Sequence, residues 1–172
     1  IQHHRQLIRD LRSDQHLTEP NATPLQLIHC AEQLGWLNRE THPFGDVLSL
    51  QPVNAVMLTW YRNNIVHLLA LPSLIACLLV NRRRGIAAER LTASVDVVYP
   101  YIARELSGSL VADTNAALTS METLGLVRKE ADVVLPAPQL SEQRLPLLLL
   151  SKLVNETLER MYIVLSLAHH GR

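Results

Sequence analysis

The longest apolar stretch of the chain runs from Ile65 to Val80 and reads IVHLLALPSLIACLLV. A helix of this composition is apolar on nearly every side, which predicts that it is buried in a core. Pro72 interrupts the stretch, and a proline inside a helix removes one backbone hydrogen bond. We therefore predict two helices, over residues 53–71 and 72–84, with Pro72 at the first position of the second helix.

A shorter helical pattern precedes this stretch and is followed by two segments that have the length of strands. Thr23 and Pro24 are typical of a helix start, and Gly35 is typical of a helix end, so we predict a helix over residues 24–34. The segments 36–40 and 47–51 enclose a turn rich in proline and glycine, which predicts an antiparallel hairpin.

The same order of elements recurs in the second half of the chain. We predict helices over residues 88–106 and 114–124, the first kinked near Pro100 and the second capped by Asp113 and ended by Gly125. A hairpin formed by residues 126–130 and 133–136 should follow. The two sub-repeats, 24–84 and 85–138, share the sequence patterns LGWLNR and LGLVRK where the helix passes into the hairpin.

A last helix is predicted over residues 141–170, with Ser141 as its N-cap and a very apolar beginning at Leu145–Leu150. Its most apolar part should pack on the helix pair of residues 65–80, because each segment is too apolar for water. The fold class that follows is mainly α-helical with two small antiparallel β-hairpins, in which winged-helix-like packing is possible.

Charge argues against nucleic acid as a partner. The chain has 16 Lys and Arg residues and 16 Asp and Glu residues, so it lacks the basic excess of a typical nucleic-acid binder. A winged helix that reads DNA needs cations or amides on its recognition helix. The candidate helices, residues 24–34 and 114–124, contain neither Lys nor Arg. A winged-helix DNA-binding domain therefore stays the weaker alternative.

Three polar residues, Arg62, Asn63 and Asn64, stand directly before the apolar stretch. Neighbouring residues on a helix lie about 100° apart, so these side chains cannot all face one surface. We predict that Arg62 and Asn63 point inward and bond to backbone carbonyls or to a carboxylate such as Asp46. The alternatives are a polar patch on the surface of a helix and direct contact with a substrate phosphate, which Arg binds well.

These residues belong to a longer pattern that resembles a known enzyme family. Tyr61-Arg62-Asn63-Asn64, His67 and Leu71-Pro72-Ser73-Leu74 resemble a YRNN…H…LPSL signature. The segments HPFGDV at residues 42–47 and SKLVNETLERMYIVL at residues 151–165 agree with it. The family is that of the large membrane-associated bacterial glycerol-3-phosphate acyltransferases, relatives of the mitochondrial enzyme.

The resemblance implies a reaction that opens phospholipid synthesis, without a cofactor. Family members transfer a fatty acyl group from acyl-CoA or acyl carrier protein to the first hydroxyl of glycerol 3-phosphate. They act at the cytoplasmic face of the bacterial inner membrane and use an H-x-x-x-x-D motif for general base catalysis. No histidine of this chain is followed by Asp at that spacing. The resemblance therefore implies a non-catalytic C-terminal domain, residues 1–172, whose partner is the upstream acyltransferase domain of the same chain.

Two groups of site residues follow. Tyr61, Arg62, Asn63, Asn64 and His67 are expected to bind substrate or to form the interface with the catalytic domain. Arg82, Arg83 and Arg84 lie at the end of the apolar stretch, where they suit an anionic membrane surface, although the stretch is too short to span a bilayer. We expect no metal site. A free-standing helical protein-interaction module is the alternative function.

Overall fold

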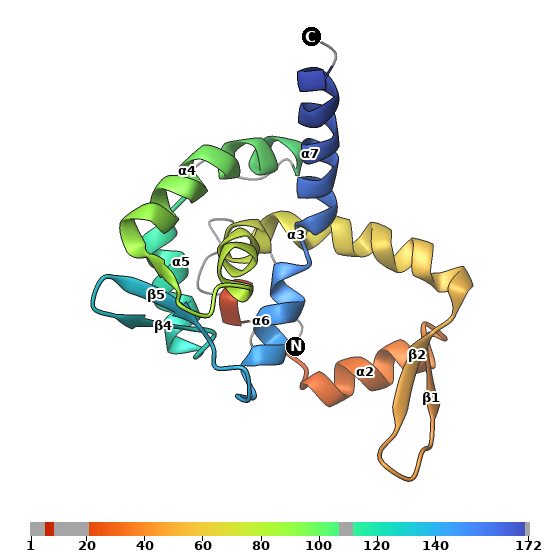
Figure 1. The fold of residues 1–172 in the computed structure, drawn as a ribbon. Helices are drawn as coiled ribbons and strands as arrows, with labels where there is room; N and C mark the ends of the chain where they lie inside the picture. Colours follow the sequence, from red (N-terminus) through yellow and green to blue (C-terminus); the bar gives the residue numbers. More distant parts are fainter. Residues whose placement is uncertain (1–5, 9–20, 107–111, 171–172) are drawn as a thin grey trace. The chain divides into compact units, whose positions relative to one another are not determined.

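The computed structural model describes residues 6–8, 21–106 and 112–170 of the chain. Helices dominate these residues, and two small antiparallel sheets accompany them, which confirms the predicted fold class (Figure 1). The chain forms two compact units. The first contains the described residues 21–64, and the second contains residues 6–8, 65–106 and 112–170.

The first unit consists of helix α2 (Pro24–Gln33), strands β1 (Leu37–Glu40) and β2 (Val47–Leu50), and the first half of helix α3 (Pro52–Val80). Thr23 caps α2 as predicted: its hydroxyl accepts a hydrogen bond from the Gln26 N–H, and the Gln26 side chain accepts one from the Thr23 N–H. Gly35 ends the helix with a φ of 68°, a conformation that costs glycine little.

The second unit contains the rest of α3, and seven elements follow it in the chain. They are listed in chain order: β3 (Ile86–Ala87), α4 (Ala88–Glu105), α5 (Thr114–Thr123), β4 (Val127–Glu130), β5 (Val133–Pro136), α6 (Arg144–Ser151) and α7 (Asn155–His170). Strand β5 is central in the sheet order β3-β5-β4. The sequence patterns did not reveal β3, because two residues carry no periodicity. Gly85 directly precedes β3. Its backbone lies so close to the sheet that a Cβ added there would be 2.5 Å from the Val134 carbonyl oxygen.

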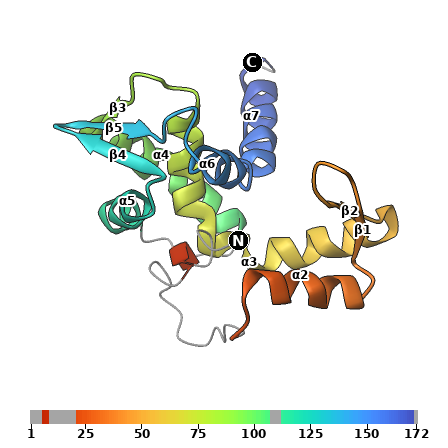
Figure 2. The ribbon, with the colours of Figure 1, turned by 90° about the horizontal axis from the view of Figure 1, so that it is seen from below.

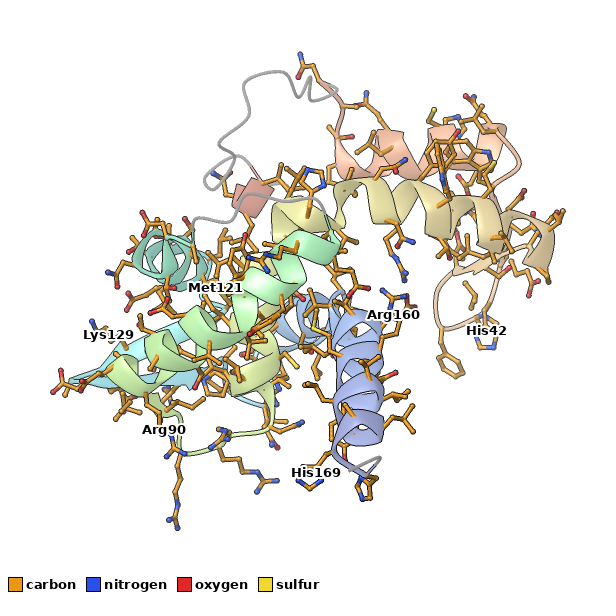
Figure 3. The ribbon with its side chains drawn as sticks, turned by 90° about the horizontal axis from the view of Figure 1, so that it is seen from above. His42, Arg90, Met121, Lys129, Arg160 and His169 are labelled. Atoms are coloured by element: carbon orange, nitrogen blue, oxygen red, sulfur yellow. The ribbon has the colours of Figure 1, made fainter. Side chains whose placement is uncertain are left out.

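The core of the second unit lies between the second half of α3, α4, α5, α6 and the inner face of the sheet (Figure 2). The fully buried large side chains are Leu7, Leu74, Ile75, Leu79, Leu91, Val95, Ile102, Met121, Leu126, Val134, Leu147 and Leu150. In Figure 3, Met121 lies between α5 and α4, whereas Lys129 lies on the outer side of the hairpin. The predicted packing of the apolar α6 on α3 is confirmed, because the Ser73 hydroxyl donates to the Leu150 carbonyl at 2.7 Å.

The predicted division of this stretch into two helices, 53–71 and 72–84, is wrong. Helix α3 does not end at Leu71 but continues through Pro72, which lies inside the helix and is buried, and it ends at Val80 rather than at residue 84. Proline disfavours the helix interior because it removes one hydrogen bond and crowds the preceding turn. Every residue from Leu69 to Val80 is buried or half-buried, and this packing outweighs the local cost.

The predicted helix over residues 141–170 is in fact two helices, α6 and α7. The N–H groups of Lys152 and Leu153 bond to carbonyls three residues earlier, so the chain tightens and turns at residues 152–154. Ser141 is not the N-cap, since α6 begins after Gln143 and the Ser141 hydroxyl donates to the Pro138 carbonyl. Neither glycine nor proline marks this break, and the sequence pattern therefore missed it.

The order of elements in the second unit is that of a winged helix. A helix, a short edge strand, two helices and a hairpin follow one another, and the edge strand β3 pairs with the second hairpin strand β5. Asp113 caps α5 through the Ala116 N–H at 2.9 Å, as predicted. Helix α5 carries neither Lys nor Arg, so the element that would read DNA in this arrangement has no cation.

Candidate functional site

The signature segment of residues 61–64 lies on α3 at the end of the first unit. The Tyr61 ring stacks on Trp36, with centroids 5.9 Å apart and planes inclined by 27°. It also meets the edge of Trp60 at 5.2 Å. Trp36 directly precedes β1, so these rings join the helix to the start of the hairpin. The Asn54 side-chain amide supports the same junction by donating to the Gly35 carbonyl at 2.7 Å.

The polar part of the signature is directed to the surface. The Arg62 guanidinium donates from Nε and Nη2 to the Asn63 side-chain oxygen, at 3.3 and 3.2 Å. Asn63 and Asn64 are exposed, and Arg62 is half-buried. The predicted inward orientation of Arg62 and Asn63 as a buried pair is therefore wrong. His67 follows one helical turn later and is half-buried, within the second unit.

Asp46, the predicted carboxylate partner of Arg62, pairs with Arg39. The Arg39 guanidinium bonds at once to Glu32 Oε1, at 2.6 Å, and to Asp46 Oδ2, at 2.9 Å. It thereby joins α2, β1 and the hairpin turn. The hydrogen bond from Arg39 lowers the pKa of Glu32, and the two carboxylates raise the pKa of Arg39. Sequence reasoning missed this clamp, because its residues stand seven positions apart in segments of different structure.

Arg82, Arg83 and Arg84 lie in the loop that follows α3, not in a helix, and all three are exposed. They differ in surroundings, however. Arg83 lines a recess on the second unit, together with residues of β4, β5 and α6, whereas Arg82 and Arg84 do not.

No group of three His, Cys, Asp or Glu side chains among the described residues could hold a metal ion. The hydroxyls of Ser73 and Ser151 donate to the carbonyls of Leu150 and Leu148, so both serines serve packing. Burial raises the pKa of the Cys77 thiol, which disfavours the reactive thiolate.

Comparison with known proteins identifies the family. The family model described as the C-terminal region of glycerol-3-phosphate acyltransferase matches residues 1–172. The chain belongs to this family.

Curated relatives agree with this assignment. A glycerol-3-phosphate acyltransferase of Pseudomonas fluorescens (strain Pf0-1) is 34% identical over 167 residues, which cover 94% of this chain and 20% of that protein. The acyltransferase of Pseudoalteromonas atlantica (strain T6c) is 34% identical over 146 residues, or 82% of this chain and 18% of that protein. The chain thus spans about a fifth of the length of the curated relatives it matches. No solved structure is significantly similar to it.

Proposed function

We propose that this region is the non-catalytic C-terminal domain of a glycerol 3-phosphate 1-O-acyltransferase, and that it docks on the upstream acyltransferase domain of the same chain. The observation that supports the proposal is the surface of the first unit. Its described residues form two helical segments and a hairpin, yet none of residues 21–64 is buried. Folded elements without a core need apolar surface from elsewhere, because burial is the main source of their stability.

The docking surface is an apolar stripe on the first half of α3. Val53, Val56 and Trp60 follow one another at helical spacing and are 77%, 79% and 62% exposed. Large aromatic and aliphatic side chains in such a stripe are typical of protein interfaces. The amides of Asn63 and Asn64 continue the surface by one turn. They favour a protein partner, since hydrocarbon would leave amide groups without hydrogen bonds.

The reaction of the whole protein would be acyl transfer from acyl-CoA or acyl carrier protein to glycerol 3-phosphate, at the start of phospholipid synthesis. Because Arg62 is only half-buried and a guanidinium suits phosphate, contact between Arg62 and the substrate phosphate is the second candidate role of the signature. If Arg62 binds the phosphate, Arg62→Ala should raise the KM for glycerol 3-phosphate. If the signature serves docking instead, the same substitution should lower the amount of folded enzyme.

The docking proposal is tested by Val56→Asp in the full-length protein. Val56 is 79% exposed in this region, so the substitution leaves the region itself folded, but it places a charge in the proposed interface. We expect a loss of acyltransferase activity of at least about tenfold and increased protease cleavage between the domains. Leu25→Asp is the matched control, because Leu25 is 75% exposed and equally apolar but lies on α2, outside the stripe. Equal behaviour of the two variants would refute the proposal.

A membrane role is the other part of the proposed function, at the cytoplasmic face of the bacterial inner membrane. Among the described residues, α3 alone is long and apolar enough to cross a membrane, but 61% of its most apolar window is buried inside the protein. We therefore place the contact at the surface, through Arg82, Arg83 and Arg84. Replacing all three by Gln should weaken flotation with anionic vesicles, by about 1 kcal/mol per charge at low salt. Unchanged flotation would exclude this role.

The alternative of a free-standing interaction module is distinguished by the same docking experiment. A free-standing module would bind its partner through the stripe without any effect of Val56→Asp on acyl transfer. A DNA-binding role has less support, because α5 lacks cations.

A further inference from the structure

A recess of about 210 Å³ on the second unit is surrounded by three arginines that are far apart in the sequence. Arg83 comes from the loop after α3, Arg128 from β4, and Arg144 from the first turn of α6. None of the residues that line the recess, within the described part of the chain, is acidic. The remaining lining is Val80, Leu135, residues 136–138 and Gln139.

Arg144 is held in place before any ligand arrives. It is half-buried, and its guanidinium donates to the carbonyls of Ala137, at 3.3 Å, and of Val80. Val80 is the last residue of α3, at the negative end of the helix dipole. This end would repel an anion, and the positive charge of Arg144 offsets the repulsion. The other two arginines are accessible to a ligand. Arg83 is exposed, and Arg128 forms a solvent-exposed pair with Glu130 at 3.4 Å, which an anion of higher charge can displace.

We propose that this recess binds a phosphate ester. Guanidinium groups recognise phosphate through paired N–H donors. Three guanidinium groups around one concave site supply more positive charge than is needed to bind a singly charged carboxylate, so they suit the higher charge of a phosphate. The apolar wall of Val80, Leu135 and residues 136–138 lies beside the cations, so the carbon portion of the ester has a surface to contact. The site is separate from the signature segment and does not depend on the docking proposal, because all of its residues belong to the second unit.

The three consecutive arginines after α3 provide the test, since Arg83 lines the recess and its neighbours do not. Hydrogen–deuterium exchange of the full-length protein is measured with dihexanoyl-phosphatidic acid as the probe. We expect slower exchange at residues 81–85 and 127–130 on adding the probe. Arg83→Gln and Arg128→Gln should weaken the apparent affinity by about tenfold, the effect of one charge-assisted hydrogen bond. Arg82→Gln and Arg84→Gln should leave it within about twofold, because only general electrostatics change.

Two further probes identify the source of the phosphate. Protection by glycerol 3-phosphate at these residues would make a soluble phosphate ester sufficient, whereas protection by the phosphatidic acid alone would show that the acyl portion is needed. Protection by dihexanoylglycerol, which has no phosphate, would overturn the proposal. So would equal weakening by Arg82→Gln and Arg83→Gln, since the effect would then come from the charge of the whole surface. Melting temperatures of the variants control for misfolding, which is not expected because Arg83 and Arg128 are exposed.

Discussion

Two units of this molecule contain the same run of local elements and bury them very differently. In each, a helix ends at a glycine of positive φ, Gly35 or Gly125, and an antiparallel hairpin follows. In the second unit, Leu126 is 1% exposed and Val127 is 3% exposed, at the start of that hairpin. In the first unit, the corresponding Trp36 and Leu37 are only half-buried.

The difference comes from the elements that lie around each hairpin. In the second unit, β3 pairs with β5, and α4, α5 and α6 close the core over the sheet. In the first unit, β1 and β2 pair only with each other among the described strands, and Val47, Leu48 and Leu50 stay exposed. A helix–glycine–hairpin pattern therefore determines local shape, while burial depends on partners that are distant in sequence.

The strongest test of this contrast is a cavity in the core of the second unit. Leu150 is 0% exposed, and Leu150→Ala should lower the free energy of unfolding by about 2–5 kcal/mol. Leu149→Ala is the matched control, because Leu149 is 50% exposed and should cost less than about 1 kcal/mol. Denaturant unfolding measures both. Equal losses would contradict the assignment of the core, including the finding that Leu149, unlike Leu150, lies at its surface.

A smaller effect is expected from the hydrogen bond between α3 and α6. Ser73→Ala removes the hydroxyl that donates to the Leu150 carbonyl at 2.7 Å, in a fully buried place. We expect a loss of about 0.5–1.5 kcal/mol in the free energy of unfolding, because the Leu150 carbonyl keeps its bond from the Leu153 N–H. Ser94→Ala provides a control, since the Ser94 hydroxyl makes a similar bond to Arg90 at the surface. A Ser73 variant as stable as the Ser94 variant would show that the bond is dispensable.

The smallest effect concerns the first unit and acidic pH. Arg39 lowers the pKa of Glu32 below its ordinary value of 4.5, so the ion pair contributes stability above that value. The contribution is lost as the pH falls through the lowered pKa, because Glu32 is then protonated in the folded state. The protection of residues 24–40 from hydrogen exchange, relative to the intrinsic exchange rate at each pH, should therefore fall below about pH 4.5. Glu32→Gln should remove this dependence, and a variant that kept it would assign the effect to another group.

The parts of the fold that the sequence revealed are those governed by local chemistry. Helix starts are marked by the side chains of Thr23 and Asp113, and helix ends by the backbone freedom of Gly35 and Gly125. Each of these four residues lies at the predicted helix end. The long α3 and the break between α6 and α7 were not predictable in this way. Packing carries α3 across Pro72, and tertiary contacts at Leu150 accompany a turn that no breaker residue marks.

The candidate sites show the same limit. The resemblance located residues 61–64 on the chain, but not the direction of their side chains, because helical spacing alone does not say which side finds a partner. The carboxylate that Arg62 was expected to bind, Asp46, forms an ion pair with Arg39 instead. The sequence did not predict the recess, because its three arginines are far apart in the chain and only the folded sheet and α6 bring them to one site. These arginines are Arg83, Arg128 and Arg144.

The burial of Ser73, the serine of the LPSL pattern, has a consequence for chemical labelling. Ser73 is 0% exposed and its hydroxyl proton is directed to a carbonyl oxygen. A reagent that acylates nucleophilic serines needs both access to the oxygen and a neighbouring base. Labelling of the full-length protein by such a reagent would therefore report on a residue other than Ser73.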